Sequence, residues 1–86
     1  MKWTHDIPKR NGWYWHRHVI GDIPDDTPIH CIIMRHPKKV RGRWTYIYDP
    51  HPSAYWNGQW RPVTEMPNGY RWFWSNVPIR LPKEAK

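Results

Sequence analysis

Two histidines spaced two residues apart, His16 and His18, are the first side chains in this sequence whose spacing suits a chemical role. On a β-strand, residues i and i+2 project from the same face, so both imidazoles could approach one metal ion. A zinc site needs at least a third protein ligand. His30 or His36 could supply one, but nothing in the sequence fixes their register. We therefore predict no metal site at His16 and His18. We expect either a solvated polar face or imidazoles that contact a bound base or phosphate.

Cys31 follows His30, which raises the question of thiol chemistry. Adjacent strand residues point to opposite faces, so His30 cannot serve as the base for the Cys31 thiol. The run Ile-Cys-Ile-Ile is typical of a buried strand. The sequence also contains no Gly-rich phosphate loop and no G-x-S-x-G or H-E-x-x-H motif. We predict no catalytic residue, no cofactor and no enzymatic activity.

Basic and aromatic residues interleave along much of the chain. Fourteen Lys and Arg oppose seven Asp and Glu, which gives a net charge of +7. Aromatic rings stack on bases while Arg and Lys bind phosphates, so this mixture favours an anionic ligand. The same alternation also arises when the aromatics are core and the cations are the solvent face of the same strands. The predicted ligand-binding residues are Tyr14, His16, His18, Lys38, Lys39, Arg41, Arg43, Arg61 and Arg71.

Short aromatic and β-branched runs, bounded by turn residues, must position these side chains. Ten prolines and five glycines are spread through the chain, and no proline-free segment shows helical periodicity. The pattern predicts an all-β fold, either a small, strongly bent antiparallel sheet or an SH3-like barrel of about five to six short strands. The predicted strands are 12–20, 29–35, 43–48, 54–57, 59–64 and 70–76.

Turn residues set the expected connections between these strands. Asn57-Gly58 predicts a type I′ hairpin turn, and Asn68-Gly69 predicts a slightly longer one. Residues 54–76 are therefore expected to form a three-stranded meander. We interpret 21–28 as a loop rich in Asp and Pro, and 36–42 as a basic turn.

The alternation of side chains in the first strand predicts which face is buried. Trp13 and Trp15 share one face, and Tyr14, His16 and His18 share the other. We expect the two tryptophans to pack in the core against Trp72 and Trp74, which leaves the opposite face open to a ligand.

The length of 86 residues suits one domain with a thin core. We predict a single β-rich domain, 1–86, with extended segments at 1–11 and 77–86. A lone cysteine excludes an internal disulfide and favours a cytoplasmic setting, and no apolar run approaches a membrane span. Eight Trp, five Tyr and one Phe exceed what one thin core needs. Some of these aromatics are therefore expected to be exposed or to lie between copies of a homo-oligomer.

Three short motifs resemble those of small phage- and prophage-encoded proteins that open with a GWYWxR-type strand. They are GWYWHR at 12–17, YWNGQWRP at 55–62 and WSNVPIRLP at 74–82, and they make up 23 of the 86 residues. Residues 19–53 depart from the pattern. The resemblance implies a viral accessory protein with a β-rich fold and implies no catalytic residue. By analogy with phage proteins of this size, it also implies action against a host defence.

These observations together predict a non-enzymatic accessory protein of the host cytosol. It would bind and sequester an anionic aromatic ligand, with a signalling nucleotide as the first choice. The alternative is an inhibitor that contacts a nucleic-acid-handling defence complex, or a module that binds nucleic acid directly. Salt separates these classes, because nucleic-acid binding weakens steeply as ions are added, whereas a Trp-centred protein interface weakens much less.

Overall fold

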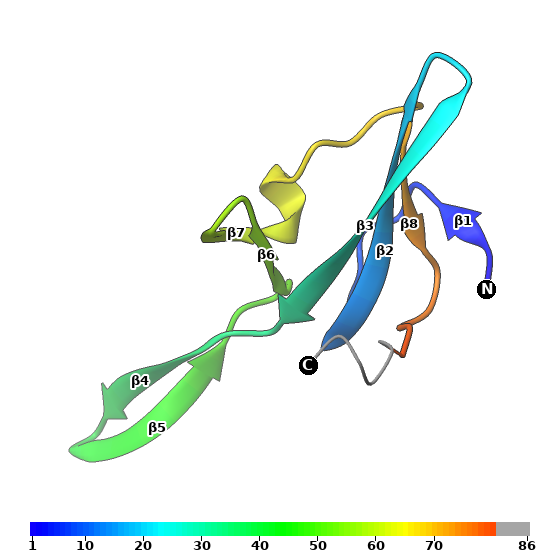
Figure 1. Ribbon diagram of the computed structural model, residues 1–86. Helices are drawn as coiled ribbons and strands as arrows, with labels where there is room; N and C mark the ends of the chain where they lie inside the picture. The colour runs from blue at the N-terminus through cyan, green and yellow to red at the C-terminus, as the bar shows by residue number, and fades with distance from the viewer. Residues whose placement is uncertain (81–86) are drawn as a thin grey trace.

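The computed structural model describes residues 1–80, which form β-strands and one short 3₁₀ helix (Figure 1). This confirms the predicted all-β class. The last part of the predicted extended segment 77–86 lies outside the described residues. The elements are β1 (Trp3–Thr4), β2 (Gly12–Ile20), β3 (Ile23–Ile32), β4 (Arg35–Val40), β5 (Arg43–Tyr48), β6 (Ser53–Trp56), β7 (Gln59–Pro62), the 3₁₀ helix η1 (Val63–Glu65) and β8 (Trp72–Ser75).

Six strands form one antiparallel sheet in the order β1-β8-β2-β3-β6-β7, and β4 and β5 form a separate two-stranded sheet. The main sheet is open, so the SH3-like barrel is wrong. Figure 1 shows the β4–β5 hairpin extending away from the main sheet, and the molecule measures 56 × 31 × 24 Å. We call residues 35–48 the arm. None of the described residues belongs to a helix long and apolar enough to cross a membrane.

The segment 21–28, predicted as a loop, is mostly strand. Gly21, with φ of 62°, and Asp22 form a two-residue turn, and residues 23–31 of β3 then pair with the whole of β2. Pro24 and Pro28 are tolerated because β6 pairs only with residues 30–32, which leaves the earlier part of β3 at the edge of the sheet. The two prolines have the same parity, so both missing N–H groups can face this open edge.

Of the next two turns along the chain, the first differs from the prediction and the second agrees with it. The predicted basic turn 36–42 is wrong, because only Arg41 and Gly42, with φ of 51° and 79°, form the turn between β4 and β5. Asn57 and Gly58 have φ of 51° and 76°, as the predicted type I′ turn requires. The three-stranded meander is also wrong, because β8 pairs with β1 and β2 and has no contact with β7 in the sheet order.

The core lies on the face of β2 that carries its even-numbered residues. The predicted packing of Trp13 and Trp15 against Trp72 and Trp74 is wrong, because β8 places Trp74 opposite His16 and Trp72 opposite His18. Of these four tryptophans, only Trp74 is fully buried, and the other three are half-buried. Among residues 1–80, the buried hydrophobic residues are Tyr14, Ile29, Cys31, Ala54, Val63, Met66 and Trp74.

Gly12 begins β2 in a backbone conformation that side chains rarely adopt. Its φ is 151°, and a Cβ placed there would lie 2.9 Å from Cβ of Pro78. We expect Gly12→Ala to lower the free energy of unfolding by about 2–4 kcal/mol, because backbone strain and overlap with Pro78 add. Urea denaturation followed by Trp fluorescence measures this change. Gly69→Ala is the matched control, because φ is 136° there and nothing lies within 4 Å. If the two variants lose equal stability, the overlap with Pro78 contributes nothing.

Candidate functional site

The face of β2 predicted to be open to a ligand is largely closed. Tyr14 and His16 are 3% and 2% exposed, so this structure encloses both side chains, and their contact with a ligand stays a prediction. The Tyr14 hydroxyl donates to the Arg10 carbonyl oxygen at 3.1 Å, and burial raises the pKa of this phenol. His18 is half-buried and lies flat on Trp72, with ring centroids 3.8 Å apart. These side chains act as packing groups.

His16 is held between two tryptophans. Its ring centroid lies 5.0 Å from that of Trp72 and 4.2 Å from that of Trp74. Burial lowers the pKa of His16 to about 4, so the imidazole is neutral at pH 7. A neutral ring with its proton on Nε2 donates to the Pro67 carbonyl oxygen, 3.3 Å away. The even-numbered face of β2 is therefore a core of stacked rings.

The groups considered for metal or thiol chemistry are dispersed or buried. Within residues 1–80, no three His, Cys, Asp or Glu side chains are placed to hold a metal ion. Cys31 is completely buried, and burial raises the pKa of its thiol to about 12. This thiol is therefore protonated at neutral pH and sealed from reagents.

Four of the six cations predicted as ligand contacts lie close together, and the other two lie on separate elements. Lys38, Lys39, Arg41 and Arg43 lie together on the arm. Arg61 lies on β7, and Arg71 lies just before β8, where its Nε donates to the Tyr70 hydroxyl at 3.0 Å. The structure thus brings together four of the nine predicted residues, all from one hairpin.

The arm concentrates the positive charge of the chain. It contains five of the fourteen Lys and Arg and none of the seven Asp and Glu. Every residue of β4 and β5 is exposed, and neither strand pairs with the main sheet. At the root of the arm, Nε2 of His36 lies 2.9 Å from Oδ1 of Asp49. The arm is therefore a basic ribbon that solvent surrounds along its length.

Three aromatic residues on β5 share one face of the arm and were missed by the sequence analysis. Trp44, Tyr46 and Tyr48 are 71%, 53% and 60% exposed. Across the hairpin they lie opposite Lys39, Pro37 and Arg35, respectively. The Arg35 guanidinium lies 4.4 Å from the Tyr46 ring centroid, and Lys39 Nζ lies 5.9 Å from that of Trp44. The exposure of these rings confirms that part of the aromatic content lies outside the core. Alternation along the predicted strand 43–48 already places the three rings on one face, and the Arg41-Gly42 turn fixes which residues of β4 lie opposite them.

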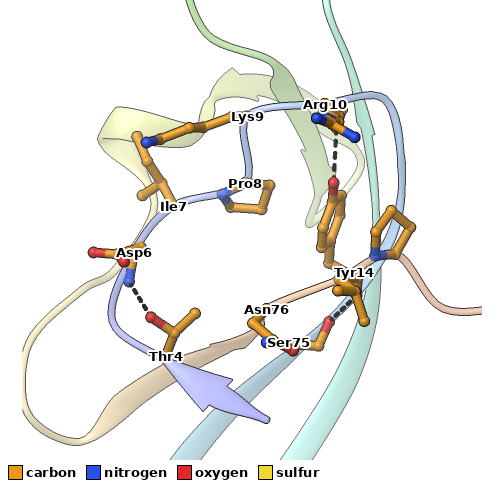
Figure 2. A pocket seen from close by; sticks show the side chains of 11 residues that line it. Thr4, Asp6, Ile7, Pro8, Lys9, Arg10, Tyr14, Ser75 and Asn76 are labelled. Carbon is orange, nitrogen blue, oxygen red and sulfur yellow. Dashed lines mark hydrogen bonds between the residues drawn. The ribbon is translucent and has the colours of Figure 1, made fainter. Parts of the chain in front are cut away.

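A recess of about 320 Å³ lies between the N-terminal segment and the sheet (Figure 2). Its uncharged polar side chains are hydrogen-bonded within the chain, and its charged side chains are two cations, Lys9 and Arg10, with one carboxylate, Asp6. Thr4 Oγ1 accepts from the Asp6 N–H at 3.1 Å, and the Ser75 hydroxyl donates to the Val77 carbonyl oxygen at 3.1 Å. Tyr14, whose hydroxyl is bonded to Arg10, is the one predicted ligand contact in its lining. The recess is therefore a weaker candidate than the arm.

The chain was also compared with known proteins. A scan against protein-family models found no match, and neither the search of curated proteins nor that of solved structures found one. The resemblance to small phage proteins stays a prediction, and the candidate functional site rests on the geometry of the arm alone.

Proposed function

We propose that this chain is a non-enzymatic module that binds nucleic acid through the arm. One observation carries the proposal: five cations and three exposed aromatic rings lie on a two-stranded ribbon that has no acidic residue and no strand partner in the main sheet. Cations bind phosphates and exposed rings contact bases, so both chemical parts of a nucleic acid have a counterpart on the arm.

The dimensions of the arm suit a polymer. Six residues per strand span about 20 Å, at roughly 3.4 Å per residue. One strand of B-form DNA presents one phosphate per 3.4 Å of rise, so this length is enough for several phosphates in succession. The five cations of the arm can then each meet a different phosphate.

The directions of the cations also favour a polymer over a single nucleotide. Arg35 and Lys39 share the aromatic face, Lys38 and Arg43 share the opposite face, and Arg41 is at the tip. A small nucleotide is normally held by a few polar groups that converge in one pocket. A strand that wraps the ribbon uses cations on both faces. Sequestration of a signalling nucleotide, action against a host defence and assembly into a homo-oligomer stay predictions.

The salt dependence of binding tests the proposal. We expect the affinity for a fluorescently labelled 20-nucleotide DNA to fall about a hundredfold between 50 and 200 mM salt if all five cations meet phosphates. Fluorescence anisotropy at several salt concentrations gives the slope.

Two matched double variants locate the contacts. R41Q/R43Q removes two charges from the arm, and we expect about a tenfold or larger loss of affinity at low salt and a slope reduced by about 1.4. R61Q/R71Q removes the same charge elsewhere, and we expect less than about a threefold loss. Equal losses in the two variants would mean that the arm is not the interface. Absence of binding to any nucleic acid would reject the proposal and leave the protein-inhibitor alternative.

A further inference from the structure

We infer that the aromatic face of the arm stacks on the bases of a single strand, so that the ligand is single-stranded rather than duplex nucleic acid. This inference rests on the proposed function. The aromatic face comprises Trp44, Tyr46 and Tyr48 on β5 with Arg35, Pro37 and Lys39 opposite them on β4. All six residues are exposed, so no other part of the described chain covers the face.

The spacing of the three rings matches that of stacked bases. Trp44, Tyr46 and Tyr48 follow one another at every second position of β5, so their attachment points are about 6.8 Å apart. This distance is twice the stacking distance of about 3.4 Å between successive bases. One base therefore fits between each pair of neighbouring rings, and two bases fit along the face.

The cations on this face show that the rings can receive a flat, electron-poor group. The Arg35 guanidinium already covers the Tyr46 ring at 4.4 Å, and Lys39 approaches Trp44 at 5.9 Å. When a base replaces the guanidinium on the ring, Arg35 can turn to the adjacent phosphate. Base and phosphate contacts then come from neighbouring side chains, as on other single-strand binding surfaces.

A duplex cannot use this face in the same way. Its bases are stacked on one another and paired, so the rings of the arm can reach them only after unpairing. A two-stranded ribbon also fits the major groove of B-form DNA, and in that case the cations and the groove edges would carry the binding. The two ligands therefore predict different roles for the three aromatic residues.

Anisotropy titrations with two probes separate these roles. The probes are a fluorescein-labelled 12-nucleotide oligothymidine and a labelled 12-base-pair duplex, both at 0.1 M salt. We expect the full-length protein to bind the single strand at least about tenfold tighter than the duplex. The variant W44L/Y46L/Y48L keeps apolar side chains without π faces, and we expect it to lose at least about tenfold in single-strand affinity and less than about twofold in duplex affinity.

A control on the opposite face of the same hairpin is V40A/I47A, which removes exposed apolar groups that share no face with the rings. We expect it to bind the single strand within about twofold of the unmodified protein. Near-ultraviolet circular dichroism verifies that each variant keeps its fold. Equal affinity for the two probes, or unchanged single-strand binding by the triple Leu variant, would overturn this inference but leave the proposed function standing if R41Q/R43Q still weakens binding. Failure of both probes to bind would reject both.

Discussion

Replacement of the arm by a two-residue Asn-Gly turn is expected to abolish nucleic-acid binding while the main sheet stays folded. The design uses a hydrogen bond that already closes the root of the arm, from the Asp49 N–H to the Met34 carbonyl oxygen at 2.9 Å. Met34, Asn, Gly and Asp49 would then form a four-residue turn with the same closing bond. Asn-Gly is the preferred centre of such a turn.

The expected loss of affinity is large because the deletion removes most of the net charge. The arm carries five positive charges and no negative one, so the net charge falls from +7 to +2. The three rings of the aromatic face are lost together with the cations. We expect the affinity for a 20-nucleotide DNA to fall at least about a hundredfold at 0.1 M salt, as measured by fluorescence anisotropy.

Two observations indicate that the armless variant keeps the fold of the main sheet and that its tryptophans can report it. Neither strand of the arm pairs with the main sheet, and seven of the eight tryptophans lie outside the arm. The near-ultraviolet circular dichroism and the urea midpoint should therefore stay close to those of the full chain. A second variant keeps the arm and places Gln at Arg35, Lys38, Lys39, Arg41 and Arg43, so it separates loss of charge from loss of the hairpin. If the folded armless protein binds as tightly as the full chain, the interface lies elsewhere.

The first and last residues of a strand could be predicted correctly where the local sequence signal is strong. The boundaries of β2 and β5, at 12–20 and 43–48, agree with prediction because each begins at or beside a glycine and continues as an aromatic or β-branched run. The first half of β3 and residues 36–40 of β4 were missed because Pro24, Pro28 and Pro37 are unfavourable within a ladder. Prolines are compatible with edge strands, and the local sequence does not reveal that a strand lies at an edge.

The burial of each face could not be predicted, because it depends on pairing between distant segments. Alternation along β2 correctly separates Trp13 and Trp15 from Tyr14 and His16. Which set is buried depends on β8, more than fifty residues away, whose register places Trp74 opposite His16. A one-residue shift of the β2–β8 register would place Trp72 and Trp74 on the other face of β2, the face that carries Trp13 and Trp15. The sequence therefore predicted the two faces of β2 and assigned the core to the wrong one.

The candidate site was predicted in part for the same physical reason. The cations of the arm are close in sequence, so their clustering needs only one hairpin. The rings of Trp44, Tyr46 and Tyr48 could equally belong to a core strand, because alternation does not show whether a second layer covers the face. Their function as an exposed surface becomes visible only when the arm is seen to stand apart from the main sheet (Figure 1).

The neutral, buried His16 is expected to make the protein strongly acid-labile between pH 6.5 and pH 4. Its pKa is about 4 in the folded protein, mainly through loss of hydration, against 6.5 when the ring is exposed. The unfolded chain therefore gains a proton in this interval that the folded chain cannot take up. The contribution of neutral His16 to the free energy of unfolding is fully present above pH 6.5 and is lost as the pH decreases, with a loss of roughly 3 kcal/mol by pH 4. Urea denaturation at pH 7, 5.5 and 4 measures this slope.

The variant His16→Phe distinguishes the contribution of this ring from general acid destabilisation. Phenylalanine retains a ring between Trp72 and Trp74 but has no proton to gain, so we expect its stability to change much less between pH 7 and pH 4. Its stability at pH 7 should be lower, because the donation to Pro67 is lost. The ion pair of Arg17 and Asp26 lowers the pKa of Asp26 below 3.8, so its contribution is lost only at still lower pH. If the free energy of unfolding falls equally with pH in His16→Phe and in the unmodified protein, the buried His16, which is 2% exposed, is not the cause of the acid lability.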